Sequence, residues 1–405
     1  MNYREITKCR ISGSTNLVPV MDLGTMALSG VLPRTRDEKV TTGPIGLVYC
    51  PDSGLLQLKQ SYNLAEMYGN NYGYRSGLNA SMVRHLRDKV AKLQRIQPVD
   101  AESSVLDIGG NDGTLLKSYH VAGLERVCID PTVEKWAEHY VGTDIRTIAG
   151  FFAGSPAGQF DIITSIAMFY DLENPHKFVQ DIAGALKPEG IWHFEQSYMP
   201  AMLRTLAYDT IVAEHLEFYT LRVVKNLLEA NGLHIIDVEL NDVNGGSFAV
   251  TACHQDSKRH KPDHRAINLL LAEEDAHDWL SLLKNFAERT KAHRHQLREL
   301  INGINNRGDT VAVLGASTKG NTLLNYCGFT HRDLVFAADV NPLKHGCFTP
   351  GSLIPIVGEE FARAYKPDYF LVGPWHFRRG LIEREKEYLA KGGHLIFPLP
   401  EIEVV

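Results

Sequence analysis

An acid and an imidazole stand side by side, as Glu214 and His215, in the stretch "AYDTIVAEHLEFY", residues 207–219. Histidine has an ordinary pKa close to neutral pH, so it is the side chain that most often accepts a proton during catalysis. The same stretch also fits a helix with an apolar face of Ile211, Val212, His215 and Phe218. In that helix the imidazole would only pack, and the stretch alone leaves both interpretations open.

The clearest ligand motif is the glycine turn "LDIGGNDGTLL", residues 106–116, between an expected strand and an expected helix. Its glycines let a ligand approach the backbone, and Asp130, at the end of the next strand, could accept hydrogen bonds from both ribose hydroxyls. A dinucleotide would bring its pyrophosphate to this turn, where Asp107 and Asp112 would repel it. The turn therefore favours S-adenosylmethionine, with its amino group and sulfonium, over a nicotinamide site or a plain tight turn.

Two further residues, Met168 and Phe169, follow the strand that should carry the adenosine end of this site. Side chains just beyond the carboxyl ends of parallel strands are favoured ligand positions in such folds. The residues expected to contact the cofactor are Asp107, Gly109, Asn111, Asp112, Asp130, Met168 and Phe169.

A second loop, "GASTKGNT", spans residues 315–322. Its glycines and the start of the following helix could offer backbone N–H groups to a diphosphate, and Lys319 adds a positive charge. The spacing from Gly315 to Lys319 is too short for a Walker loop. A structural Rossmann-like unit without a ligand is the alternative.

Two cysteines raise the question of a metal. Cys9 and Cys50 begin "CRIS" and "CPDS", where a zinc knuckle would carry a second cysteine at Ser12 and Ser53. Serine is a poor zinc ligand at neutral pH, so two thiolates would leave the tetrahedron half empty. We expect a small knuckle-like module without a metal.

These residues need an α/β frame to position them. The segment 81–93, "SMVRHLRDKVAKL", predicts an amphipathic helix, and alternating strands and helices follow it. The alternation predicts a doubly wound, mostly parallel sheet, and it restarts near residue 310 as a second unit of similar layout. We expect an irregular knuckle-like domain at 1–70, a class I methyltransferase Rossmann-like domain at 71–255, and a helical connector with a second Rossmann-like domain at 256–405.

Composition excludes several classes of protein. The chain has 405 residues and a formal net charge of −6, which argues against a general nucleic-acid surface. No uninterrupted apolar run approaches a membrane span, and charges occupy the amino-terminal stretch "MNYREITKCR". We expect a cytoplasmic, monomeric protein that binds neither nucleic acid nor membrane.

Four ordered motifs, "DIGGNDGTLL", "AEHLEFYT", "NGGS" and "LGASTKGNTLLNYCG", together resemble the S-adenosylmethionine-dependent sugar C-methyltransferases. That family adds the branch methyl of deoxysugars such as those of the tetronitrose, mycarose and noviose pathways. The resemblance covers nearly the whole chain and implies a nucleotide-linked 4-keto-6-deoxysugar as substrate, methylated at C3. The chain departs from the family at the two zinc cysteines, at Val212, where relatives often have tyrosine, and at Asp171, near a histidine of some relatives.

The resemblance implies roles for individual residues. His215 would be the base that forms an enolate, with Glu214 binding a sugar hydroxyl and Tyr74 or Asp171 in the proton relay. Two tyrosines that only pack their loop, "NYGYRSGLN", are the alternative for that stretch. The residues expected to bind the nucleotide sugar are Tyr72, Ser76, Asn79, Tyr198, Lys319, Asn321, Asp339, Lys344, Trp375 and His376.

Other functions stay open at this point. An O-methyltransferase acting on a sugar or phenol needs no neighbouring ketone, and a nucleotide-sugar dehydrogenase or epimerase would need a nicotinamide site. A non-catalytic protein that only binds S-adenosylmethionine is the third alternative.

Overall fold

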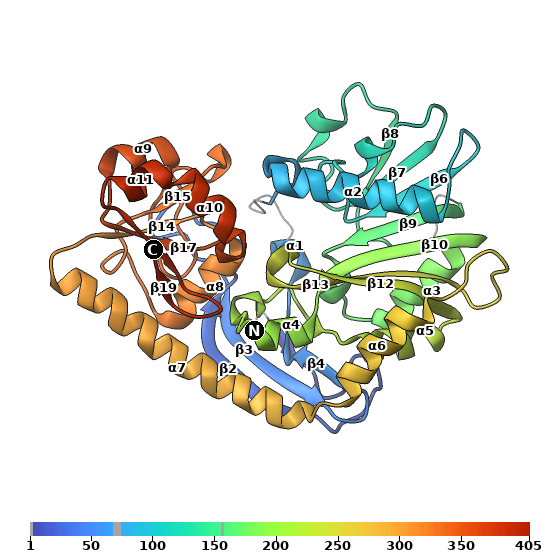
Figure 1. Ribbon diagram of the computed structural model, residues 1–405, viewed down its shortest axis with the longest axis horizontal. Coiled ribbons are helices and arrows are strands. Elements are labelled where there is room, and N and C mark those ends of the chain that lie inside the picture. Colours follow the sequence, from blue (N-terminus) through green and yellow to red (C-terminus); the bar gives the residue numbers. More distant parts are fainter. Residues whose placement is uncertain (1–2, 68–73, 155–157) are drawn as a thin grey trace.

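The computed structural model describes residues 3–67, 74–154 and 158–405. Within that part of the chain, three larger sheets account for most strands, beside a small ribbon of β1 (Tyr3–Glu5) and β5 (Gln60–Tyr62). Figure 1 shows the amino-terminal sheet low in the molecule, between the other two. The long helix α7 (Trp279–Asn306) runs along the lower edge and connects the right-hand part of the molecule with the left-hand part.

The largest sheet is the doubly wound α/β unit that the sequence predicts. Five neighbouring strands, β10, β9, β6, β7 and β8, are parallel. On the other side of β10, β13 pairs antiparallel with β10, and β12 pairs antiparallel with β13. In spatial order the strands are β12 (Leu233–Asn241), β13 (Ser247–His254), β10 (Leu186–Ser197), β9 (Phe160–Ile166), β6 (Ser104–Ile108), β7 (Glu125–Asp130) and β8 (Ile145–Ala149). Buried side chains cover both faces of this sheet, as a doubly wound fold requires.

The amino-terminal sheet differs from the short strands and turns expected there. Two of its strands are long, β2 (Val18–Ala27) and β3 (Thr42–Cys50), and they continue through β4 (Leu55–Leu58). Its outer strand β11 (Glu217–Phe218) comes from the stretch that carries His215. The knuckle-like module therefore shares a sheet with the segment expected to be catalytic.

The carboxy-terminal sheet repeats the parallel layout, as predicted. Its strands, in spatial order, are β16 (Ile356–Gly358), β15 (Ala337–Asp339), β14 (Val311–Leu314), β17 (Tyr369–Val372), β18 (His394–Phe397) and β19 (Glu403–Val404). All neighbouring pairs are parallel except β18 with β19.

The predicted helix near residues 81–93 is α2 (Ala80–Ile96), which buries Leu86, Val90 and Leu93 at helical spacing. Asn79 caps its first turn by accepting the N–H of Ser81 at 2.9 Å. The connector is helical as predicted, in α6 (His264–Asp275) and α7. The other helices are α1 (Leu64–Met67), α3 (Pro175–Ala185), α4 (Met199–Arg204), α5 (Leu221–Glu229), α8 (Thr318–Cys327), α9 (Glu359–Tyr365), α10 (Arg378–Arg384) and α11 (Lys386–Ala390).

Two helical predictions are wrong. The glycine turn is followed only by a 3-10 turn, η2 (Leu116–Ser118), because the chain becomes extended at Tyr119, whose ring is buried in the core. Residues 207–219 hold only the short η5 (Tyr208–Thr210) and β11. Their first half makes short-range turn hydrogen bonds, such as Thr210 N–H to the Ala207 carbonyl, whereas Leu216 and β11 pair with other parts of the chain.

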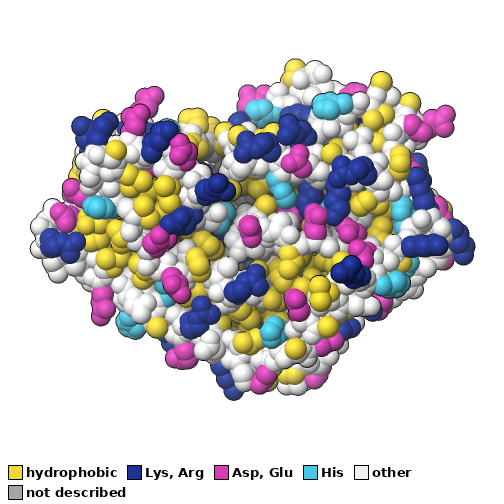
Figure 2. Space-filling model, in the orientation of Figure 1, with side chains coloured by type: hydrophobic (Ala, Val, Ile, Leu, Met, Phe, Trp, Pro, Cys, Tyr) yellow, Lys and Arg dark blue, Asp and Glu magenta, His cyan; other side chains and the backbone are white. Residues whose placement is uncertain are grey.

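Among the described residues, no helix is long and apolar enough to cross a membrane. Basic and acidic side chains are interspersed over the face drawn in Figure 2. On this face they form no continuous basic stripe of the kind that a nucleic-acid backbone requires.

Candidate active site

The stretch around His215 is buried almost throughout. From residue 206 to residue 221, His215 is the one position that is not buried. Leu216 anchors the stretch on both sides, because its N–H donates to the Tyr170 carbonyl at 2.8 Å and its carbonyl accepts the Leu58 N–H at 2.8 Å. A buried segment that leaves one imidazole accessible is a suitable support for a catalytic base.

The hydrogen bonding of His215 sets its tautomer. A carbonyl can only accept, so Nδ1 donates to the Thr210 carbonyl at 2.8 Å and Nε2 keeps its lone pair. The Tyr170 ring packs against the imidazole, with centroids 4.2 Å apart. Burial, together with the charge of Lys319, lowers the pKa of His215 to about 3 although the Thr210 carbonyl opposes this. The ring is therefore neutral at physiological pH, with Nε2 able to accept a proton.

Glu214 points into a different part of the same region. Its side chain is buried, and neither carboxylate oxygen has a hydrogen-bond partner among the described residues. A Cβ added at Gly30 would lie 2.8 Å from Glu214 Oε1, so the amino-terminal module closes directly over the carboxylate. Burial raises the pKa of Glu214 to about 7.

The cofactor turn joins β6 to β7 at the carboxyl edge of the large sheet. Gly109 and Gly113 have φ angles of +74°, which glycine adopts at low cost. Asp130 holds the turn by accepting the Asn111 N–H at 3.0 Å, and it also accepts the Thr132 N–H at 2.6 Å. The Thr132 hydroxyl also donates to Oδ1 at 2.5 Å, so Oδ2 keeps one lone pair with which Asp130 can still accept a ribose hydroxyl.

The carboxylates of this turn suit a cationic ligand. Asp107, Asp112 and Asp130 are each less than 7% exposed. Burial raises the pKa of Asp107 to about 7, although a 2.6 Å hydrogen bond from Thr164 opposes the shift. Met168 lies against the turn, since a Cβ added at Gly109 would meet its side chain at 3.2 Å. The residues present therefore fit S-adenosylmethionine.

The segment before α2 lies across this turn. The N–H groups of Ser76 and Gly77 each donate at 3.0 Å, to Asn111 Oδ1 and to Asp112 Oδ2. Tyr74 is 48% exposed as a residue, yet burial raises the pKa of its hydroxyl, which interacts with the Ser76 side chain. Tyr72 lies outside the described residues. Asn79 uses its side-chain oxygen as a helix cap, which leaves it less available to a substrate than expected.

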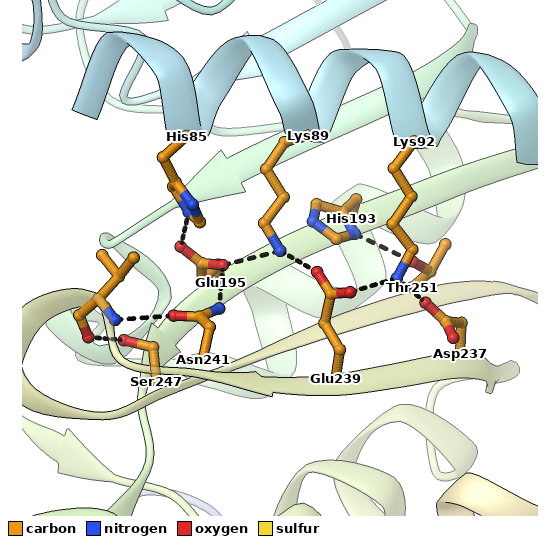
Figure 3. Close-up of polar contacts among 11 residues, drawn as sticks. His85, Lys89, Lys92, His193, Glu195, Asp237, Glu239, Asn241, Ser247 and Thr251 are labelled. Carbon is orange, nitrogen blue, oxygen red and sulfur yellow. Dashed lines mark hydrogen bonds and ion pairs between the residues drawn. The ribbon is translucent and has the colours of Figure 1, made fainter. Parts of the chain in front are cut away.

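A polar network fastens α2 to the sheet (Figure 3). Glu195, near the carboxyl end of β10, accepts hydrogen bonds from His85 at 2.6 Å and Asn241 at 2.7 Å and pairs with Lys89 at 2.9 Å. Burial raises the pKa of Glu195, but His85 and Lys89 outweigh burial and hold it at about 2. Lys89 also pairs with Glu239. The network holds α2 in place, and α2 in turn positions the preceding segment 74–79 against the cofactor turn.

Side chains of the carboxy-terminal unit reach the region of the catalytic stretch. Lys319 extends from the start of α8 and donates to the Asn244 carbonyl in η6 (Val243–Gly245). Trp375 Nε1 donates to Asp209 Oδ2 at 2.7 Å. His376 follows Trp375, and burial together with the charge of Lys319 lowers its pKa to about 3. Lys319 therefore affects His376 and His215 alike.

Asp209 is a residue that the sequence did not single out. It is 1% exposed, and its Oδ1 has no hydrogen-bond partner among the described residues. Burial raises its pKa, whereas Lys319 and Trp375 oppose that shift. An acid within an otherwise apolar stretch was the available indication, but nothing local identifies Trp375 as its partner.

Other predicted substrate residues support the loop of the carboxy-terminal unit. Asp339 accepts the Ala316 N–H at 3.0 Å and pairs with Lys344 at 3.0 Å. Lys344 also donates to the Ala316 carbonyl at 2.9 Å. Both side chains thus hold the first turn of this unit in place, and Asn321 donates to the Ser29 carbonyl at 2.8 Å.

Two predicted ligand contacts are core residues instead. Phe169 has no exposed surface, and its ring stacks on Tyr219 with centroids 5.4 Å apart. Tyr198 is also buried, and its hydroxyl donates to Glu274 on α6 at 2.7 Å. Because both rings pack in the core, they are not available to a ligand. The prediction rested on their positions after a strand and did not consider core packing. Asp171 lies beside Tyr170 in η4 (Phe169–Asp171).

Arg10 connects the knuckle to the catalytic stretch. Its guanidinium donates to the Leu58 carbonyl at 2.6 Å and to Ser61 Oγ at 2.9 Å, and its Nε lies 3.6 Å from Glu217 Oε1. Both charged side chains of this pair are almost completely buried. Since Glu217 pairs with Gln57 in the β11–β4 ladder, Arg10 helps to fix the stretch that holds His215.

The knuckle brings its four positions together but does not fit zinc. Cys9 Sγ lies 3.3 Å from Ser53 Oγ, and Ser12 Oγ lies 3.5 Å from Cys50 Sγ. Burial raises the pKa of Cys9, but hydrogen bonds from Ser12, Ser53 and the backbone outweigh burial and lower it to about 7. Two thiols and two hydroxyls do not form a zinc tetrahedron, and the described residues contain no cluster of three or more His, Cys, Asp or Glu that could hold a metal.

Three known families match successive parts of the chain. Residues 9–68 match a putative zinc binding domain, residues 78–238 a methyltransferase domain, and residues 242–400 a C-methyltransferase C-terminal domain. The fold and the cofactor turn thus define an S-adenosylmethionine-dependent methyltransferase.

A characterised relative narrows this class. The chain is 32% identical over 421 residues to C-methyltransferase NovU of Streptomyces niveus, covering 99% of this chain and 97% of that protein. The chain belongs to the C-methyltransferase family. The protein is an S-adenosylmethionine-dependent C-methyltransferase.

Solved structures resemble only part of the chain. CcbJ methyltransferase from Streptomyces caelestis is 12% identical with a TM-score of 0.35, covering 42% of this chain and 89% of that one. A chain of the complex between the Haloferax volcanii Trm112 methyltransferase activator and a putative methyltransferase is 16% identical with a TM-score of 0.37, over 43% and 94% respectively. Likenesses this distant carry no argument about substrate.

Proposed function

We propose that the enzyme transfers the methyl group of S-adenosylmethionine to C3 of a nucleotide-linked 4-keto-6-deoxysugar. The observation that carries the proposal is His215, an accessible imidazole whose Nε2 keeps its lone pair because Nδ1 donates to Thr210. C3 lies next to the 4-keto group, which makes its proton removable by such a base.

In the proposed reaction His215 Nε2 accepts the C3 proton. The electron pair of the broken C–H bond forms an enolate, with the negative charge on the C4 oxygen, to which the Tyr74 hydroxyl would donate. When bound, S-adenosylmethionine supplies a methyl group activated by its sulfonium. The enolate carbon would accept this methyl, with the electron pair of the C–S bond left on sulfur and the ketone restored.

The ligands would divide between the two Rossmann-like units, 71–255 for the cofactor and 256–405 for the nucleotide. Asp130 would bind the ribose of the cofactor, and Asp107 and Asp112 would favour its cationic part. Lys319 would pair with the diphosphate, beside Trp375 and His376. A bound diphosphate would also offset the charge of Lys319 and so raise the pKa of His215 towards a value better suited to a base.

Mass spectrometry tests this proposal. The enzyme is incubated with S-adenosylmethionine and a panel of TDP-, GDP- and CDP-linked 4-keto-6-deoxysugars. We expect one of these sugars to gain the mass of one methyl in place of one hydrogen, with S-adenosylhomocysteine formed in equal amount. If no member of the panel is methylated, the assigned substrate class is wrong.

A further inference from the structure

The amino-terminal module contributes polar groups to the region around Glu214. The loop between β2 and β3 contacts the catalytic stretch through Gly30 and contacts α8 through Ser29, whose carbonyl accepts Asn321 Nδ2 at 2.8 Å. The same loop is held on the carboxy-terminal unit by a 2.8 Å hydrogen bond from the Phe348 N–H to the Pro33 carbonyl. Three parts of the chain therefore converge on the dipeptide Ser29–Gly30.

Several buried polar atoms at this convergence lack a well-aligned hydrogen-bond partner among the described residues, although the backbone N–H groups of Glu214 and Gly30 oppose the rise in the Glu214 pKa. Ser29 Oγ, Asn321 Oδ1 and both oxygens of Glu214 are buried without a hydrogen-bond partner among the described residues. Ser29 and Asn321 are 3% and 1% exposed, and Glu214 is 6% exposed. Buried polar atoms in proteins almost always have partners, so a group of such atoms in one place indicates a bound molecule.

The donor and acceptor types of these atoms indicate which functional groups the bound molecule carries. Glu214 and Asn321 present acceptor oxygens, and one serine hydroxyl can donate only once. Ordered water, or a ligand that carries several O–H or N–H groups close together, would supply the missing donors. A sugar ring with hydroxyl or amino substituents has this property, whereas a phosphate has only acceptors to offer.

We propose that Ser29, Glu214 and Asn321 form a subsite that binds the hydroxyl or amino substituents of the sugar ring and so selects among deoxysugars. This inference rests on the proposed function, and it adds the amino-terminal module to the substrate site. The absence of a side chain at Gly30 keeps Glu214 within the subsite, since an added Cβ would lie 2.8 Å from its Oε1.

Competition between two sugars tests the subsite. TDP-4-keto-6-deoxyglucose carries a C2 hydroxyl that TDP-4-keto-2,6-dideoxyglucose lacks, and kcat/KM for methyl transfer is measured with each. We expect the preference of the wild type for the hydroxylated sugar to fall roughly tenfold in Ser29→Ala, because a hydrogen bond to a buried group is lost. S-adenosylmethionine affinity should not change.

Two further variants complete the test. Ser352→Ala is the matched control, because Ser352 is also 3% exposed but shares a 2.6 Å hydrogen bond with Thr349, and it should keep the wild-type preference. Gly30→Ala removes no polar atom but crowds Glu214, and it should lose the preference as Ser29→Ala does. If both loop variants fold and keep the wild-type preference, the atoms only hold water and the subsite is wrong. If the wild type methylates neither sugar, the proposed function itself fails.

Discussion

At the scale of single residues, the proposed reaction depends on His215 as its base. His215→Ala should bind both ligands nearly as the wild type does but lose methyl transfer by roughly 100-fold or more, the usual effect of removing a general base. Single-turnover kinetics and calorimetry of each ligand measure the two effects separately. The variant should also lose any exchange of the C3 hydrogen with deuterated water that the wild type shows with S-adenosylhomocysteine bound. Near-normal turnover of the variant would contradict His215 as the general base and would assign that role to Tyr74 or Asp171.

Glu214 should determine how activity depends on pH. Its pKa is raised to about 7, so the carboxylate is charged above that pH and becomes protonated as the pH falls through it. The charged form is the better acceptor for a sugar hydroxyl, so kcat/KM should fall on the acid side of about pH 7. The amide in Glu214→Gln cannot titrate, so this variant should not show the fall in kcat/KM on the acid side of the pH profile. The pKa of His215 lies near 3, so a limb that persists in Glu214→Gln would contradict both assignments.

Sequence alone indicated Glu214 and His215 as candidates but not the residues that surround them. Glu214 and His215 were recognisable as residue types, and the carboxylates of the cofactor turn followed from their spacing along one motif. Asp209 and Ser29 were not recognisable, because their partners Trp375 and Asn321 lie 166 and 292 residues away. Contacts at such separations depend on the tertiary fold, which a single sequence does not encode locally.

At the scale of elements, the knuckle should retain its structure without a metal. Only two of its four ligand positions are thiols, and thiol–hydroxyl contacts at 3.3 and 3.5 Å stand where a four-cysteine knuckle would hold zinc. Purified protein should therefore contain well under one zinc per chain by elemental analysis and keep its thermal midpoint in chelator. Ser12→Cys/Ser53→Cys is the positive control and should bind about one zinc. Stoichiometric zinc in the wild type would reveal ligands that these four positions do not include.

Regular elements were predictable where local pattern and tertiary structure agree. The helix α2 follows from apolar residues at helical spacing and covers the whole predicted segment 81–93, whereas Asn79, predicted as a substrate residue, caps it. Residues 207–219 show a similar spacing but do not form a helix, because almost every side chain there is buried and Leu216 bonds to Leu58 and Tyr170. When all sides of a segment are buried, apolar periodicity no longer distinguishes a helix from an extended chain.

At the scale of the whole molecule, the two Rossmann-like units should bind different ligands. Lys319→Ala removes the cation at the start of α8, so the KM for the nucleotide sugar should rise roughly tenfold or more. S-adenosylmethionine binding, measured by calorimetry, should stay unchanged because the cofactor turn lies in the other unit. An equal loss of both affinities would indicate misfolding or a shared site.

The most direct test of the account is the position of the transferred methyl group. The enzyme is supplied with S-adenosylmethionine labelled with carbon-13 in its methyl group and with the nucleotide-linked 4-keto-6-deoxysugar that it methylates, and the product is examined by NMR. We predict that the labelled methyl is bonded to a ring carbon and correlates with C3 and with the neighbouring C4 carbonyl. A labelled methyl on oxygen would contradict carbon methylation through an enolate, and a methyl on a carbon not adjacent to C4 would contradict the role given to His215.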